Sequence, residues 1–356
     1  MSLRVALIGC GFFGRFQAEA WTRIREVELV ALCDHERQRA SVLAEQLGVT
    51  QVYSNVEAML AALTPDLLDI ATPESSHAAL VRAAVTRRIA VVCQKPLAPS
   101  LSEAEAMVAH ATAAGVPFLV HENFRFQPWY RETRRLLDAG TFGSLHAMSF
   151  RLRPGDGQGP RAYLDRQPYF QSLPRLLVHE TAIHLIDVFR YLAGEPDAVY
   201  ARLFRRNPVV RGEDAGLFLL EFPGPVVALF DGDRHVDFPA DDPRLTMGTL
   251  QIDGTAASLR LDGWGRLWLK PFGGPEREHI YAWSKAGPHG NAVEAFQRHV
   301  VQHLAGAAAA ESAAHNYLQN LRIEDAIYRA AASGRRIRLR PPPTGRTRSP
   351  RRGSSG

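Results

Sequence analysis

The feature that most restricts the fold is a glycine pattern, G-x-G-x-x-G, formed by Gly9, Gly11 and Gly14. It follows an apolar run rich in strand formers, Arg4–Ile8, and precedes a helical pattern over Arg15–Ile24. Between a strand and a helix, such glycines allow a tight turn, a close approach of the backbone to a pyrophosphate, and close packing of helix on strand. The phosphate then lies at the helix N-terminus, where free N–H groups favour an anion. The pattern therefore predicts a dinucleotide site.

A carboxylate at the end of the next predicted strand supports this interpretation. Asp34 follows the strand-like run Val27–Cys33 and lies twenty residues after Gly14. A carboxylate there can hydrogen-bond the ribose hydroxyls of NAD and repels a 2′-phosphate. The cofactor prediction is therefore NAD, with NADP left possible because basic residues follow at His35, Arg37 and Arg39.

The first 120 residues alternate strand and helix patterns with short connections. The strands are continuous apolar runs, which is typical of a parallel sheet covered by helices on both faces. Capping-box spacings at Ser54–Glu57 and Ser102–Glu105 indicate two helix starts. The expected fold class is α/β, beginning with a doubly wound Rossmann sheet.

After about residue 122 the pattern changes to closely spaced strands, with helices predicted at Asn291–Leu304 and Tyr317–Ala332. Short turns between strands favour a large, mostly antiparallel sheet in an α+β arrangement. We therefore divide the chain into a Rossmann domain at 1–122, a substrate and oligomerisation domain at 123–340, and a tail at 341–356.

The positive net charge does not by itself indicate a nucleic-acid partner, because most of it lies in the C-terminal tail. The net charge is +5, but four arginines lie in the Pro-, Gly- and Ser-rich tail, and without them it is +1. The tail is expected to be disordered, and contact with a polyanion is the less favoured alternative. No basic stripe and no bilayer-spanning apolar stretch occur, so we expect neither a nucleic-acid nor a membrane partner. The three cysteines and the absence of a signal-peptide pattern indicate reduced thiols and a cytoplasmic location.

Three further segments, together with the glycine loop, resemble the glucose–fructose oxidoreductase / inositol dehydrogenase / MocA family. They read ATPESSH at 71–77, CQKP at 93–96 and ETAIHLID at 180–187. Their order and spacing carry the resemblance over nearly the whole chain, to about residue 340. The family fold is an N-terminal Rossmann domain followed by an α/β domain on an open sheet that often forms an oligomer interface. The resemblance therefore implies a homodimer or homotetramer.

The resemblance also implies a cofactor set and a reacting lysine. Lys95 is expected to reach the reacting oxygen of the substrate, and the bond to Pro96 is often cis in the family. Two positions depart from the family pattern, because Glu74 replaces the usual Asn and Gln94 replaces the usual Glu. The expected cofactor-binding residues are Gly9, Gly11, Phe12, Phe13, Gly14, Asp34, Thr72, Pro73, His77, Gln94 and Lys95.

A second group of reactive side chains lies on a predicted helix at Arg175–Leu192. Glu180 and His184 are four apart on one face, so the carboxylate can orient the imidazole, which can then exchange a proton with a substrate hydroxyl. By resemblance, this pair takes the place of the family's D-x-x-x-H dyad. His179 and His184 are five apart and diverge by roughly 140° around a helix, so a zinc site is not expected. Alternatively, His184 is a core histidine beside Asp187.

The remaining candidate residues lie on loops. Asn123 and Arg125 are at the crossing between the two domains, and Arg125 serves either the ligands or a salt bridge between the domains. Arg161 and Tyr163 lie in a long Gly/Pro-rich loop that forms a lid or a binding loop, or else a subunit contact. With Lys95 and His184, these residues form the predicted substrate site. His289 borders the cleft in one interpretation, and nothing in the sequence decides this.

The main hypothesis is an NAD(P)-dependent dehydrogenase acting on a secondary alcohol of a sugar or cyclitol. Lys95, His184 and Glu180 are its predicted catalytic residues, and no metal is expected. Two alternatives use the same fold. The first is a sensor that binds NAD(P) or a metabolite without turnover, and the second is a glycosidase that uses NAD for a transient oxidation.

Overall fold

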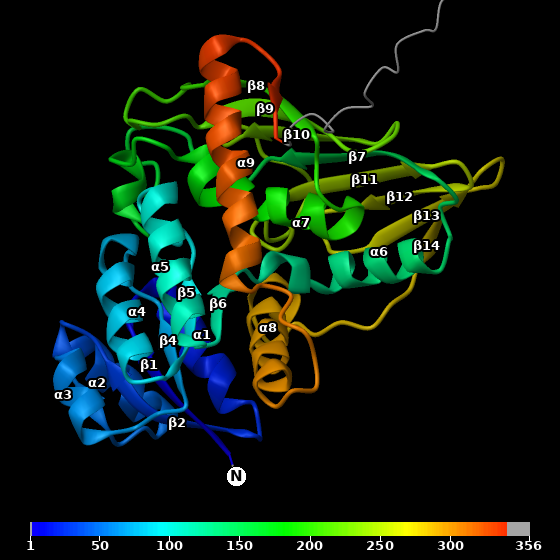
Figure 1. Cartoon of the computed structure of the whole chain (residues 1–356). Helices are drawn as coiled ribbons and strands as arrows, with labels where there is room; N and C mark the ends of the chain where they lie inside the picture. The colour runs from blue at the N-terminus through cyan, green and yellow to red at the C-terminus, as the bar shows by residue number, and fades with distance from the viewer. Residues whose placement is uncertain (1, 340–356) are drawn as a thin grey trace, which may run out of the picture.

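The computed structural model describes residues 2–339, and the predicted tail at 341–356 lies outside the described residues. Two sheets, one of six strands and one of nine, organise this part of the chain (Figure 1). We call the six-stranded sheet and its helices the Rossmann unit, and the nine-stranded sheet and its helices the open-sheet unit. This architecture confirms the predicted α/β fold class.

The Rossmann unit is a fully parallel sheet in the order β3-β2-β1-β4-β5-β6. Crossing from β1 to β4 reverses the direction of strand order, and ligands bind beyond the carboxyl ends of the strands at such a point. The strands, in chain order, are β1 (Leu3–Ile8), β2 (Val27–Cys33), β3 (Val52–Tyr53), β4 (Leu67–Ile70), β5 (Ala90–Gln94) and β6 (Phe118–His121).

Helices cover both faces of this sheet, and alternate residues of each strand face opposite cores. In β1, Ala6 and Ile8 pack toward α3, α4 and α5, whereas Val5 and Leu7 pack toward α1 and α2. Burial on both faces explains why the strands are apolar throughout. The covering helices are α1 (Phe12–Thr22), α2 (Arg37–Leu47), α3 (Val56–Ala62), α4 (His77–Thr86) and α5 (Leu101–Ala114).

The open-sheet unit has the order β14-β13-β12-β11-β7-β10-β9-β8-β15, and its pairings are antiparallel except for β7 with β10. The predicted, mostly antiparallel sheet is therefore confirmed. The strands are β7 (Leu145–Leu152), β8 (Ala198–Phe204), β9 (Ala215–Glu221), β10 (Val227–Asp233), β11 (Gly248–Gly254), β12 (Ala257–Leu261), β13 (Leu267–Pro271), β14 (Arg277–His279) and β15 (Ile337–Arg338).

One face of the open sheet is buried under α6 (Pro128–Asp138), α7 (Ile183–Ala193) and α9 (Ala314–Ser333). On the other face, large apolar side chains stay more than a third exposed, among them Phe204, Leu217 and Leu229. The C-terminal helices also return to the Rossmann unit. Helix α8 (Pro288–Leu304) packs on α1, and α9 runs beside α5 (Figure 1). The two units are therefore joined along both faces of the Rossmann sheet.

Two predicted helix caps are shifted by one or two residues. The side chain of Asn55, not Ser54, accepts a hydrogen bond from the Ala58 backbone at the start of α3. Likewise Ser100, not Ser102, accepts from Glu103 at the start of α5. Both helices begin where they were expected, but an adjacent polar side chain with the required extended backbone takes the cap. No helix within residues 2–339 is long and apolar enough to cross a membrane.

Candidate active site

The glycine loop has the geometry that a dinucleotide requires. Gly9 has φ +98°, and a Cβ there would lie 2.7 Å from the backbone of Ala71. A Cβ at Gly14 would lie 1.9 Å from the carbonyl oxygen of Gly9, so these two glycines are fixed by packing. At Gly11 no described atom lies within 4 Å of that position. Gly11 also precedes the first turn of α1 without a capping side chain, which leaves open backbone for a phosphate.

Asp34 closes the other side of this loop. Its carboxylate accepts hydrogen bonds from the backbone N–H groups of Cys10 and Glu36 at 2.8 and 2.9 Å. The neighbouring ring of His35 is mostly exposed, with Nδ1 3.2 Å from Asp34. The acidic group thus stands at the carboxyl end of β2, where the ribose of a bound dinucleotide would meet it. The residues present fit NAD.

The segment after β4 is held by hydrogen bonds of its own. Thr72 and Ser76 share a hydroxyl contact of 2.7 Å, and Pro73 precedes a 3₁₀ turn, η1 (Glu74–Ser76). His77 has no exposed surface, and its ring nitrogens lie 3.0 and 2.8 Å from the carbonyl oxygens of Leu97 and Thr72. His77 therefore holds the backbone of this loop in place. Contrary to our prediction, its side chain is fully buried and not accessible to a cofactor.

Lys95 follows β5 and is held by a carboxylate from the other unit. Its Nζ lies 2.9 Å from Oε1 of Glu180 and donates to the Glu180 carbonyl oxygen at 2.7 Å. Gln94 accepts from the Lys95 backbone N–H at 2.7 Å, and the bond to Pro96 is cis. An ammonium group has three donors, so one remains for a substrate oxygen. Where the family pattern has Glu, this chain has Gln94, and the carboxylate that pairs with Lys95 comes from Glu180 instead.

The pairing of His184 differs from the predicted dyad. Its Nδ1 lies 2.7 and 2.8 Å from the two carboxylate oxygens of Glu122, the residue that follows β6. Glu180, predicted to orient His184, instead contacts Lys95. The physical reason is that Glu180 belongs to a π-helical turn, Leu177–Ala182, which ends before α7, so regular four-residue spacing does not apply across it.

Burial sets the protonation of this pair. It raises the pKa of Glu122 well above its ordinary value, and it lowers the pKa of His184, with the charge of Lys95 acting in the same direction. When Glu122 is ionised its carboxylate can only accept, so Nδ1 of a neutral His184 then carries the hydrogen. Within residues 2–339 no partner contacts Nε2, which is left to accept a proton. This arrangement can perform general base chemistry.

Aromatic and imidazole rings complete this side of the site. Phe124 stacks on His184 with ring centroids 4.0 Å apart and an angle of 7° between the planes. On Phe124 also lies His289, at 5.3 Å, with its pKa lowered to about 4 by burial. The 287–290 segment, whose place was undecided from sequence, therefore borders the site. Asn123 is almost fully buried, and its Nδ2 has no hydrogen-bond partner among the described residues.

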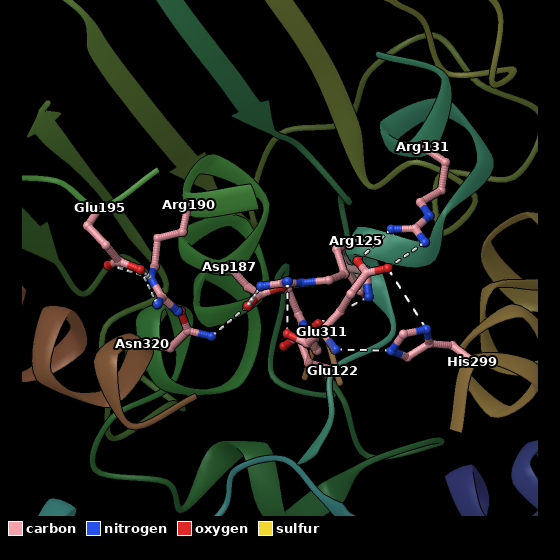
Figure 2. Close-up of polar contacts among 11 residues, drawn as sticks. Glu122, Arg125, Arg131, Asp187, Arg190, Glu195, His299, Glu311 and Asn320 are labelled. Carbon is pink, nitrogen blue, oxygen red and sulfur yellow. Dashed lines mark hydrogen bonds and ion pairs between the residues drawn. The ribbon is translucent and has the colours of Figure 1, made fainter. Parts of the chain in front are cut away.

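Arg125 forms an ion pair behind the site. Two of its nitrogens donate to the Asp187 carboxylate at 2.7 and 2.6 Å, and a third donates to the Glu311 carbonyl. Figure 2 shows Arg125 between these two residues, with Arg131 also held by Glu311. This is a salt bridge, but Asp187 lies with Arg125 in the predicted 123–340 domain, so the pair does not join the two domains as predicted. The same pair occupies Asp187, which does not hydrogen-bond His184.

Among the described residues, the two predicted loop residues pair with partners other than Lys95 and His184. Arg161 is exposed and pairs with Asp165, and Tyr163 is buried against Phe170. The loop instead directs Arg166 over the ring of Phe12, 5.8 Å from its centroid. It also holds Tyr169, which is half exposed, where partial desolvation and the charges of Glu180 and Glu74 raise its pKa. Tyr169 was not among the predicted site residues, because an irregular loop has no periodic pattern that shows which side chains face the site.

The fold, the glycine loop and Asp34 define an NAD-binding oxidoreductase, and comparison with known proteins agrees. A family model described as an oxidoreductase family with an NAD-binding Rossmann fold matches residues 3–122. A model of the GFO/IDH/MocA C-terminal domain matches residues 130–260. The chain belongs to the GFO/IDH/MocA family of oxidoreductases, which confirms the resemblance stated from its motifs.

Several relatives are similar over almost their whole length. A D-apiose dehydrogenase from Paraburkholderia graminis is 33% identical, over 94% of this chain and 89% of its own. One from Rhizobium rhizogenes is 30% identical, over 94% and 97%. An oxidoreductase from Agrobacterium radiobacter, solved with NAD+, L-tartaric acid and magnesium, has a TM-score of 0.86 and 29% identity, over 95% of this chain and 99% of its own.

Proposed function

We propose that this protein oxidises a hydroxyl group of a small sugar, with Lys95 and His184 as its catalytic residues. Nε2 of His184 takes the hydroxyl proton, while the free N–H of Lys95 hydrogen-bonds the oxygen as it becomes a carbonyl. The C–H bond at the same carbon breaks with transfer of hydride, for which bound NAD supplies the acceptor. Reversal of these proton movements gives the reduction.

The observation that carries this proposal is the way the two residues are held. Lys95 comes from the Rossmann unit and is paired with Glu180 of the open-sheet unit, whereas His184 of the open-sheet unit is paired with Glu122. Each reactive group thus has a carboxylate across the boundary between the units. The charge of Lys95 also lowers the pKa of His184, and this proximity supports placing both groups at one reaction centre. Groups held in this way need little reorganisation during reaction.

D-Apiose is the first substrate to test, because the two relatives named D-apiose dehydrogenases match this chain over at least 89% of their own length. Other relatives supply the remaining arms of the panel, namely D-xylose, myo-inositol and a D-glucoside. The assay measures absorbance of NADH or NADPH after each sugar is mixed with protein and NAD or NADP. We expect NADH to form with at least one small sugar. Tight NADH binding without turnover on the panel would favour a sensor, and glycoside cleavage without net NADH would favour a glycosidase.

We further propose that the exposed face of the nine-stranded sheet joins two copies of the chain. Leu217 and Leu229 lie on neighbouring strands and are 36% and 37% exposed, and Phe204 on the next strand is 44% exposed. Exposed apolar side chains gathered on one face are typical of an interface. Light scattering should give a dimer or tetramer, and Leu229→Asp should lower the mass. A monomeric wild-type protein would contradict this part.

A further inference from the structure

His179 has a carboxylate on each side of its ring. Nδ1 lies 2.7 Å from Oε1 of Glu324, and Nε2 lies 3.2 Å from Oε2 of Glu74. The side chain of His179 is only 12% exposed. Ionised carboxylates only accept hydrogen bonds, so both ring nitrogens can donate only when the ring is an imidazolium. The buried histidine therefore carries a positive charge shared between two acidic partners.

The surroundings stabilise that charge. Burial is the largest single influence and opposes it, but the hydrogen bonds and negative charges of Glu324 and Glu74 together raise the pKa of His179 to about 10. The partners also come from different parts of the fold. Glu74 lies after β4 of the Rossmann unit, and Glu324 lies on α9. The imidazolium consequently ties the edge of the cofactor site to the open-sheet unit. Glu74 is a departure from the family pattern, so this bridge is not carried over from the resemblance.

His179 belongs to the π-helical turn that holds Lys95. Each neighbouring residue of this turn is fixed from outside. The backbone N–H groups of Leu177 and Val178 donate to Glu213, and Thr181 accepts from the buried Arg234. Glu180, immediately after His179, holds Lys95 through both its carbonyl and its carboxylate. A π-helical turn is rare and is found mostly at functional sites. We infer that the contacts with Glu213 and Arg234 help to hold the backbone of the turn in this conformation.

We propose that His179 is a positioning residue, whose charged ring, held by Glu74 and Glu324, fixes Glu180 against Lys95. The inference rests on the proposed function of Lys95 but concerns a different residue. His179 does not contact Lys95 in the structure, and it acts through the backbone of the turn. Loss of the contacts of His179 with Glu74 and Glu324 should therefore weaken the hold of Glu180 on the Lys95 ammonium and make that amine more reactive.

The test measures how fast Lys95 is acylated by an amine-reactive ester, read by mass spectrometry on the full chain with and without NADH. His179→Gln keeps a hydrogen-bonding side chain but removes the charge. We expect labelling of Lys95 to rise roughly fivefold, the factor that corresponds to about 1 kcal/mol, as expected for loss of one hydrogen bond. Glu74→Gln and Glu324→Gln each remove one partner and should raise labelling as well, even if His179→Gln fails to fold.

The matched control is Arg322→Gln. Arg322 on α9 pairs with Glu105 on α5 at 2.8 Å, so this ion pair also joins α9 to the Rossmann unit but does not touch the turn. It should leave Lys95 labelling unchanged. An equal rise in this control would show general loosening and overturn the inference, as would unchanged labelling in folded His179→Gln, Glu74→Gln and Glu324→Gln proteins.

Turnover separates this inference from the proposed function. On the active sugar, His179→Gln should lower kcat in the wild-type background but cause no further loss in Lys95→Ala, because it acts through that lysine. A further loss of equal size in both backgrounds would overturn the positioning role. Full activity of Lys95→Ala would instead contradict the proposed function, whatever the labelling shows.

Discussion

His184 and Glu122 are 62 positions apart in the chain, and Nδ1 of the histidine meets the carboxylate at 2.7 Å. Glu122 is fully buried, and the histidine is almost so. This contact joins the residue that follows β6, the last strand of the Rossmann unit, to the first turn of α7. It fixes the ring of His184 with Nε2 free, which is the orientation a general base needs.

Replacing Glu122 tests this contact. Glu122→Gln keeps the shape but cannot stabilise the imidazolium that forms when His184 takes a proton, so kcat should fall roughly 100-fold. Burial already penalises the charge of Glu122, so the amide should not lower the melting temperature. Steady-state kinetics and thermal unfolding measure both quantities. An unchanged kcat would show that His184 does not depend on Glu122.

Two glycine variants should separate cofactor binding from packing. Gly11→Ala adds a Cβ into space that is open in the structure, so it should leave the melting temperature unchanged while weakening NADH binding about tenfold. Gly14→Ala places a Cβ 1.9 Å from the Gly9 carbonyl oxygen, so it should destabilise the fold by about 1–3 kcal/mol. NADH fluorescence and thermal unfolding give the two readings. The reverse pattern would contradict the assigned place of the phosphate.

Asp34 should determine the choice between NAD and NADP. Asp34→Ser removes the carboxylate that would accept the ribose hydroxyls, so the Kd for NADH should rise roughly tenfold, and the preference over NADPH should shrink. The matched variant Arg37→Gln changes an exposed neighbour and should leave NADH binding unaffected. Titration with both cofactors checks this. Equal effects of the two substitutions would show that Asp34 has no special part.

A buried carboxylate should make stability depend on pH. Asp69 on β4 is fully buried, and burial raises its pKa to about 7, although Trp21 donates to it at 2.7 Å. The folded protein therefore resists ionising Asp69, and stability is lost as pH rises from about 4 toward 7. Asp69→Asn should remove this loss, raising stability at pH 8 by up to about 4 kcal/mol and changing it little at pH 4. Denaturant unfolding at the two pH values measures the difference, and no gain at pH 8 would contradict it.

The sequence predicts local structure better than it predicts partners. The apolar runs and glycines give the strands of the Rossmann unit and the cofactor loop, because these depend on neighbours along the chain. The caps at Asn55 and Ser100 were displaced by one and two residues, since several polar side chains compete at each helix start.

Contacts between distant segments could not be read in the same way. Glu180 and His184 have helical spacing, which favoured a pair, but the π-helical turn and the distant Glu122 separate them. The pattern at Asn291–Leu304 predicts a helix but not its neighbours, and only tertiary packing places α8 on α1. Arg125 had two predicted roles, a ligand contact or a salt bridge between the domains, and neither included its bidentate contact with Asp187 of its own domain.

The catalytic role of Lys95 is tested by comparing wild type with Lys95→Ala at saturating NAD and the active sugar. We predict that NADH formation falls at least about 100-fold while the Kd for NADH stays within about twofold, because the lysine stabilises the reacting oxygen and not the cofactor. Thermal unfolding of both proteins controls for loss of fold. A Lys95→Ala protein that turns over at the wild-type rate would contradict a catalytic role for Lys95.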